Sequence, residues 1–274
     1  MDFLKDILIK IVSIFLTILF FGIVVVTITF VGNLSSDVPS PKKEAKKEIK
    51  KEVEKLVSHY HYWTDNKSNP HHGTVSVKSN DVISSVYNKK NTNAISWGTF
   101  YKRIIKHDKI KLSFVYDLFD EIYKTKVLSR SEFADIIVTF VQNIPYNIIT
   151  NDSCADAYLN NKSVKDMIDE GIDCDGKIFG GIYTPTEFIK NFKGDCDTRT
   201  VFLYTVLNKY NFDIKILNSD FYGHSIIGVN LPWRGSYKNH LGKRYYTWET
   251  TSKNWKLGDI PPSTSDMNLW YVAL

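Results

Sequence analysis

Cysteine is scarce in this chain of 274 residues, which contains three, Cys154, Cys174 and Cys196. So few cysteines exclude a fold held together mainly by disulfides, and their odd number leaves at least one thiol unpaired. Cys154 and Cys174 lie 20 residues apart in a segment rich in Asp, Asn and Gly. If the domain is exported, these two cysteines could form a disulfide, and if it is cytoplasmic we expect two free thiols.

Nucleotide-binding motifs are also missing, since the sequence contains neither G-x-G-x-x-G nor a P-loop. The net charge of +5 is small, and much of it comes from residues 41–58. No basic stripe with interleaved aromatic residues follows, which argues against a nucleic-acid partner. We expect no cofactor. The chain as a whole has 43% hydrophobic and 24% charged residues, a composition typical of a globular rather than a disordered protein.

Charged residues are absent from positions 11–36, and the stretch 11–31 is almost wholly apolar. A helix needs about 20 such residues to cross a bilayer. The run is longer than the apolar region of a secretory signal peptide, and no small-residue cleavage site follows it. We therefore expect residues 1–36 to be an N-terminal tail and a single transmembrane helix, a signal-anchor that makes the membrane a partner.

Residues 37–58 are rich in lysine and glutamate, with apolar residues every three or four positions after the prolines. This pattern predicts a charged helical stalk, followed by a soluble domain over 59–274. The lysines argue for a cytoplasmic domain by the positive-inside rule. A short tail, one span and a large domain are instead the layout of an anchored, exported protein. We favour an extracytoplasmic domain, with the lysines as contrary evidence.

Four histidines lie within fourteen residues, and they raise the hypothesis of a metal-binding membrane protein. Zinc needs three or four convergent ligands, and adjacent histidines point in different directions in any regular structure. No cysteine or acid lies nearby at a standard ligand spacing. We therefore expect no metal site and interpret these side chains as surface or packing groups; they are His59, His61, His71 and His72.

Two helices are predicted around the third cysteine. Ser129 and Glu132 form a capping-box pattern that begins an amphipathic helix, and Pro145 ends it. Asp195 is a natural N-cap for the helical segment that runs to residue 210. Cys196 then lies in the first turn of that helix, where backbone N–H groups favour a thiolate.

Three strand-like segments follow, at residues 213–217, 223–229 and 243–251. His224 lies at the beginning of the second segment and Glu249 near the end of the third. Adjacent antiparallel strands would place His224 beside Cys196 and Glu249 behind His224. A thiol, a base and a group that orients the base are the minimum for acyl transfer by cysteine.

This order of motifs, G-D-C at a helix start, G-H opening a strand and W-E-T-T ending the next, resembles the transglutaminase-like superfamily, whose fold is related to papain. Bacterial members often have an upstream amphipathic helix that ends in I-P-Y, which here is 144–146. The resemblance covers residues 129–251. It implies an α+β fold in which the helix bearing the cysteine packs on an antiparallel sheet.

The resemblance also implies a function: a cysteine peptidase, amidase or transglutaminase-like acyltransferase that acts on peptide or carboxamide bonds. Cys196, His224 and Glu249 would form its triad, and Tyr146 and Asp195 are candidates for oxyanion or substrate contacts. The acid departs from the family, since aspartate is usual at this position, and Asp220 is a weaker alternative.

The same fold without activity gives the alternative, a binding module of the cell envelope. The sequence does not choose between hydrolysis and transfer to an amine. It is also silent on the substrate and on the oligomeric state.

Overall fold

The computed structural model describes residues 54–274. This part of the chain is α+β, with eight α-helices, a five-stranded antiparallel sheet and two two-stranded sheets. The predicted transmembrane helix lies outside the described residues. Within residues 54–274, no helix has the length and apolarity needed to cross a membrane.

The described chain opens with a hairpin of β1 (Leu56–Thr64) and β2 (Pro70–Lys78), paired antiparallel along their whole length. The helical stalk predicted over 37–58 is therefore wrong at residues 56–58, and the rest of it lies outside the described residues. The reason is tertiary: the hairpin ladder and the burial of alternate side chains, such as Trp63, outweigh a local helical pattern.

Helices follow the hairpin and precede the large sheet. Helix α5 (Arg130–Gln142) starts as predicted, because Ser129 and Glu132 form a capping box with reciprocal side-chain and backbone hydrogen bonds. The eight helices are α2 (Ser79–Lys90), α3 (Trp97–Asp108), α4 (Ser113–Thr125), α5 (Arg130–Gln142), α6 (Cys154–Asn160), α7 (Lys162–Asp169), α8 (Pro185–Asn191) and α9 (Cys196–Lys209).

The large sheet has the order β7-β8-β6-β5-β9, so that the strand carrying His224 lies in its centre. The three predicted strands are confirmed as β5, β6 and β8, whereas β7 and β9 were not anticipated. The last strand comes from the C-terminal segment and pairs with β5. The strands are β5 (Ile214–Ser219), β6 (His224–Val229), β7 (Tyr237–His240), β8 (Lys243–Trp248) and β9 (Tyr271–Val272).

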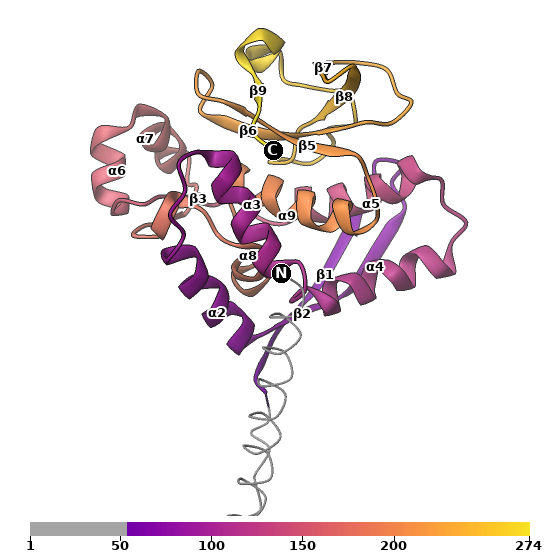
Figure 1. The fold of residues 1–274 in the computed structure, drawn as a ribbon, viewed down its shortest axis with the longest axis horizontal. Helices are drawn as coiled ribbons and strands as arrows, with labels where there is room; N and C mark the ends of the chain where they lie inside the picture. The colour runs from indigo at the N-terminus through magenta and orange to yellow at the C-terminus, as the bar shows by residue number, and fades with distance from the viewer. Residues whose placement is uncertain (1–53) are drawn as a thin grey trace, which may run out of the picture. The chain divides into compact units, whose positions relative to one another are not determined.

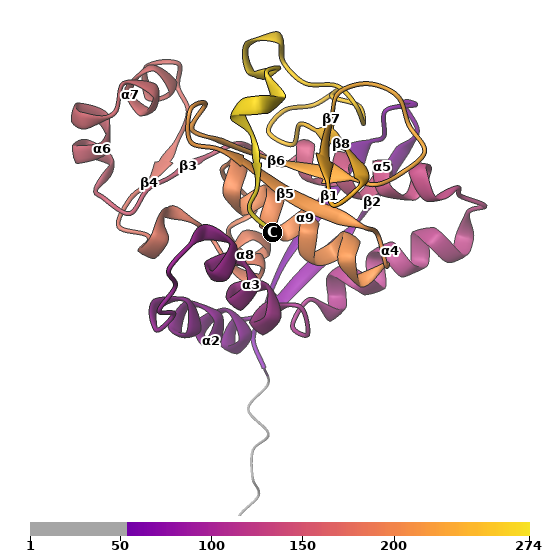
Figure 2. The same ribbon diagram turned by 45° about the horizontal axis from the view of Figure 1, so that its top comes forward.

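Helix α9 lies between two layers. One side packs against the large sheet, and the other faces α5 and α8, with the β1–β2 hairpin beyond (Figure 1; Figure 2 shows the same arrangement from another side). Its buried residues include Phe202 and Val206, which share one core with Phe140 of α5 and Phe188 of α8. Such burial on several sides fixes the helix, and with it the position of Cys196 at its first residue.

Candidate active site

Cys196 is the first residue of α9, as predicted. The Asp195 side chain caps the helix by accepting a hydrogen bond from the Thr198 backbone N–H at 3.0 Å. Gly194 comes just before, and a Cβ at this position would lie 2.8 Å from Thr198 Cγ2 and 3.0 Å from a ring carbon of Phe188. Only glycine therefore allows this close approach. The Cys196 thiol is free and 8% exposed.

His224 and Glu249 meet at one edge of adjacent antiparallel strands. His224 opens β6 and Glu249 directly follows β8, and His224 Nε2 lies 2.8 Å from Glu249 Oε2. The other carboxylate oxygen accepts hydrogen bonds from the Thr250 N–H at 2.8 Å and from the Thr251 hydroxyl at 2.7 Å. The hydrogen bonds from Thr250 and Thr251 thus fix the longer side chain of glutamate in a conformation that still reaches the imidazole. Asp220 is not the partner of His224, since it accepts from the Tyr271 hydroxyl at 3.0 Å.

The Glu249 carboxylate is ionised over the whole physiological range. Burial pushes its pKa upward, but hydrogen bonds from His224 and Thr251 outweigh burial and bring the pKa to about 2. With Nε2 taken by this carboxylate, Nδ1 is the ring nitrogen left for a proton from the thiol.

The environment of Cys196 differs from the expected one. Burial raises the pKa of the thiol, and the charges of Asp197 and Asp195 raise it further, whereas the Ser225 backbone N–H that faces the sulfur acts in the opposite direction. We expected the helix start to favour a thiolate, but the capping carboxylate and a second one in the first turn occupy that same end. The thiol is therefore protonated at neutral pH.

Cys196 and His224 are linked through the backbone, because Ser225, the residue after His224, directs its N–H at the Cys196 sulfur. Between the side chains of Cys196 and His224, both within the described part, there is no direct hydrogen bond. In free enzymes such contacts are often long and close only when substrate is bound.

A buried polar network lies behind the site and joins four elements. The Tyr101 hydroxyl of α3 donates to Asp197 Oδ1 at 2.6 Å, and Asn218 of β5 donates to Tyr101 at 3.0 Å. The Ser225 hydroxyl of β6 donates to Asn218 Oδ1 at 2.9 Å. This network fixes Asp197 beside Cys196 and His224. No sequence motif pointed to Tyr101, which lies 96 residues before its partner Asp197.

Tyr146 lies next to the segment that precedes Cys196, since it forms an isolated parallel bridge with Gly194. The Arg199 guanidinium carbon lies 5.6 Å from the centre of its ring. Burial is the largest cause of the raised pKa of Tyr146, so its phenol is protonated at neutral pH. No hydrogen bond to the phenol is found among the described residues. The role of Tyr146 as an oxyanion or substrate contact therefore stays a prediction.

Trp270, from the C-terminal segment, covers the imidazole. Its ring centre lies 5.9 Å from that of His224, edge to face, and its indole N–H donates to the Thr264 carbonyl at 2.8 Å. It is 1% exposed. Trp270 thus shields the His224–Glu249 pair from water, which strengthens that interaction. Sequence reasoning missed it, because nothing local links position 270 to position 224.

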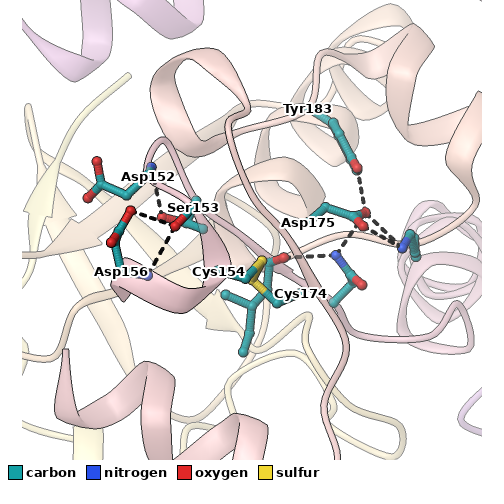
Figure 3. The surroundings of a disulfide bond; sticks show 11 residues. Asp152, Ser153, Cys154, Asp156, Cys174, Asp175 and Tyr183 are labelled. Carbon is teal, nitrogen blue, oxygen red and sulfur yellow. Dashed lines mark hydrogen bonds and ion pairs between the residues drawn. A yellow bond between two sulfur atoms is a disulfide. The ribbon is translucent and has the colours of Figure 1, made fainter. Parts of the chain in front are cut away.

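Cys154 and Cys174 form a disulfide, with their Cα atoms 6.1 Å apart (Figure 3). The bond joins the start of α6 to β4 (Cys174–Asp175), which pairs in parallel with β3 (Ile148–Ile149). This answers the question that the sequence left open. The bond closes the segment that contains α6 and α7, in which Ala157 is the one buried residue of the two helices.

Asp175, beside the disulfide, connects this segment to the residues around the site. It accepts hydrogen bonds from the Tyr183 hydroxyl at 2.6 Å, from Asn147 at 3.1 Å and from Lys193 at 2.9 Å (Figure 3 labels Asp175 and Tyr183). Asn147 follows Tyr146, and Lys193 precedes Gly194. The α6–α7 segment is therefore attached to both chain segments that approach Cys196.

The histidine cluster serves packing. His59 bonds to the Lys190 carbonyl, His61 to the Phe140 carbonyl, and His71 to the Asp65 carboxylate at 3.2 Å. Three of the rings face inward from the hairpin, whereas His72 faces outward. Across residues 54–274, no group of three or more His, Cys, Asp or Glu side chains is placed to hold a metal ion.

Comparison with known proteins adds no relative. No family model, no curated protein and no solved structure matches this chain. What the site can do follows from its own chemistry: a buried thiol at a helix start, an imidazole from the adjoining strand, and an ionised carboxylate that orients the imidazole.

Proposed function

We propose that this protein is a membrane-anchored thiol enzyme that acts on peptide or carboxamide bonds through Cys196, His224 and Glu249. The observation that carries the proposal is the 2.8 Å contact between His224 Nε2 and the buried, ionised carboxylate of Glu249. The residue that follows His224, Ser225, faces the Cys196 sulfur with its backbone N–H. A nucleophile, a base and an orienting acid in this order are the requirement for covalent acyl transfer.

The first step uses a neutral thiol. As the substrate carbonyl carbon approaches, Nδ1 of His224 takes the proton from Cys196, the S–C bond forms, and the carbonyl electrons move to the oxygen. Glu249 stabilises the imidazolium that results. Proton transfer thus accompanies attack, because the carboxylates around the sulfur disfavour a thiolate before substrate is present.

The second step expels the amine. The imidazolium donates its proton to the leaving nitrogen, the oxyanion electrons re-form the C=O bond, the C–N bond breaks, and a thioester on Cys196 remains. Water then gives a carboxylic acid, or a second amine gives a new amide. These outcomes correspond to a cysteine peptidase or amidase and to a transglutaminase-like acyltransferase.

Two donors are positioned for the oxyanion. The backbone N–H of Cys196 belongs to the first turn of α9, where such groups have no partner in the helix. The Tyr146 phenol lies next to this turn and is protonated. Asp195 is not assigned this role, because its carboxylate is engaged as the helix cap and accepts the Thr198 N–H at 3.0 Å.

The fold and the disulfide support the finer parts of the proposal. A cysteine helix packed on an antiparallel sheet is the arrangement expected of the papain and transglutaminase-like fold. A disulfide between Cys154 and Cys174 favours an oxidising compartment, and therefore an exported domain behind the expected N-terminal anchor.

The test is the covalent intermediate. Full-length protein in detergent is incubated with a library of glutamine-containing peptides, which offer both peptide bonds and side-chain carboxamides, and the intact mass of the protein is measured. We expect an acyl adduct that hydroxylamine removes, that is absent in Cys196→Ser, and that forms far more slowly in His224→Ala. An adduct that persists in Cys196→Ser, or equal rates with and without His224, would exclude this mechanism.

One observation favours a second function, a peptide-binding module of the cell envelope without turnover. The thiol is protonated and makes no hydrogen bond to the imidazole among the described residues. Such a module would retain peptides from the same library without any change in its intact mass, and Cys196→Ser would bind them as well as the wild type.

A further inference from the structure

Arg199 is a buried cation whose hydrogen-bond acceptors within residues 54–274 are all backbone carbonyls. It lies one turn after Cys196 on α9 and is 0% exposed. Its guanidinium donates four hydrogen bonds, all to backbone carbonyls: Nε to Gly194 at 2.9 Å, Nη1 to Val141 at 2.7 Å and to Thr250 at 3.2 Å, and Nη2 to Ile144 at 2.7 Å. Within residues 54–274 it forms no salt bridge.

The four carbonyls belong to three chain segments, and each segment carries a residue of the site. Gly194 lies two residues before Cys196, and Thr250 directly follows Glu249. The other two carbonyls lie at the C-terminal end of α5, just before Tyr146. The Val141 carbonyl also accepts from the Ile144 N–H at 3.0 Å, and the Gly194 carbonyl from the Asn147 N–H at 3.3 Å. The guanidinium thus adds a second bond to these two carbonyls and pairs those of Ile144 and Thr250.

Such an arrangement costs free energy that a purely structural residue would avoid. Desolvation by burial is the largest influence on Arg199 and lowers its pKa to about 10, so the side chain still carries its charge at neutral pH. Burying a charged side chain is expensive, because the charge loses its hydration. The planar fork of arginine, however, can bind several carbonyls at fixed angles, which lysine cannot do.

We infer that Arg199 is the positioning residue of the site, and that its guanidinium holds the segments of Cys196, Tyr146 and Glu249 at fixed mutual distances. It acts through their backbones and does not touch the substrate. The inference rests on the proposed function, because it assigns Arg199 a role in the geometry of that same site.

The test compares Arg199→Lys with a matched control, Arg130→Lys. Arg130 also donates to two backbone carbonyls, those of Tyr210 and Asn211, but near the opposite end of α9. The readout is the rate at which iodoacetamide alkylates Cys196 across pH, measured with and without His224→Ala in each background. The ratio of the two rates reports how strongly the imidazole is coupled to the thiol.

We expect the ratio to differ from one in the wild type and in Arg130→Lys, and to fall to about one in Arg199→Lys, with an unchanged circular dichroism spectrum. Acyl-adduct formation should fall about 100-fold, the usual cost of a misplacement of about 1 Å. A ratio that persists in Arg199→Lys would overturn this inference alone. A ratio of one in the wild type would overturn the proposed function, and this inference with it.

A measurement on the wild type covers the case in which Arg199→Lys does not fold. Among the five arginines, all of which lie in the described part, Arg199 alone is buried, so its Nε–H should give the slowly exchanging guanidinium signal in a nitrogen NMR spectrum. Alkylation of Cys196 should shift this signal and leave the exposed arginines unchanged. If the signal does not move, Arg199 is not coupled to the nucleophile and the inference is wrong.

Discussion

His224 Nε2 and Glu249 Oε2 lie 2.8 Å apart, and this contact decides which nitrogen of the imidazole can accept a proton. Because the ionised carboxylate holds the ring N–H at Nε2, Nδ1 carries the free lone pair. The carboxylate is itself fixed by hydrogen bonds from the two threonines that follow it, Thr250 and Thr251. The tautomer of His224 thus depends on Glu249, which lies 25 residues further along the chain.

Glu249→Gln should remove this control. The amide can donate to Nε2, which moves the ring proton to Nδ1 and leaves His224 unable to take the thiol proton. We expect acyl-adduct formation to fall about 1,000-fold or more, by analogy with the loss of the orienting acid in other triads. Glu249→Asp keeps the negative charge, and its rate of acyl-adduct formation should lie between those of Glu249→Gln and the wild type. If Glu249→Gln reacts at the wild-type rate, Glu249 does not orient the base.

Asp197 should lower the reactivity of the Cys196 thiol in the free protein, because its negative charge disfavours the thiolate. Its carboxylate is among the causes of the raised pKa of Cys196. Asp197→Asn removes this charge, so the midpoint of Cys196 alkylation by iodoacetamide should move to lower pH. Asp220→Asn is the control, since Asp220 contacts Tyr271 and should leave the midpoint unchanged. A midpoint in Asp197→Asn that equals or exceeds that of the wild type contradicts the prediction.

Acid should destabilise the fold through Glu249. Its pKa is about 2 in the folded protein, against an ordinary value of 4.5. A depressed folded pKa gives stability that is complete above about pH 5 and is lost as the pH falls towards 2. The difference corresponds to about 3 kcal/mol for this buried group, at 1.36 kcal/mol per pKa unit.

The measurement for this prediction is urea unfolding of the wild type and Glu249→Gln between pH 7 and pH 2. The gap between their unfolding free energies should narrow as the pH falls. Glu132 also has a pKa lowered to about 2, by its hydrogen bonds to Lys67 and Ser129, but it is present in both proteins and cancels in the comparison. A gap that stays constant with pH would show that Glu249 does not titrate as described.

Local signals predicted the parts of the fold that are locally encoded. The capping box at Ser129, the N-cap at Asp195 and the strand pattern around His224 each depend on neighbours within a few residues, and all three are confirmed. The order of the segments then led to the correct pairing of β6 with β8. His224 and Glu249 could therefore be paired from the sequence, although glutamate is unusual at that position.

What the sequence could not predict depends on contacts between distant segments. Tyr101 and Trp270 reach the site from opposite ends of the described chain, and the burial of Arg199 is visible only when three segments meet around it. The thiol pKa is a further case. A helix start alone favours a thiolate, but burial, followed by the charges of Asp197 and Asp195, raises the pKa of the thiol. The two aspartates are visible in the sequence, whereas the burial depends on the packing of distant segments. For the same reason β1 replaced the end of a predicted helix.

The disulfide between Cys154 and Cys174 should stabilise a segment that has little core of its own. A cross-link across about 20 residues contributes about 3 kcal/mol in the loop-entropy description. Because α6 and α7 bury almost nothing, its loss in Cys154→Ala/Cys174→Ala should open residues 151–177 first. Limited proteolysis should then cut within this range, while the circular dichroism of the remaining fold changes little.

Asp175→Asn is the control for this last prediction, because it weakens the contacts to Tyr183 and Lys193 but keeps the cross-link. It should resist the protease better than the double cysteine variant. Treatment of the wild type with a reductant should reproduce the double variant, since Cys196 is buried and unpaired in both. If neither reduction nor the double substitution changes the cleavage pattern, the α6–α7 segment is held by its hydrogen bonds to the site rather than by the disulfide.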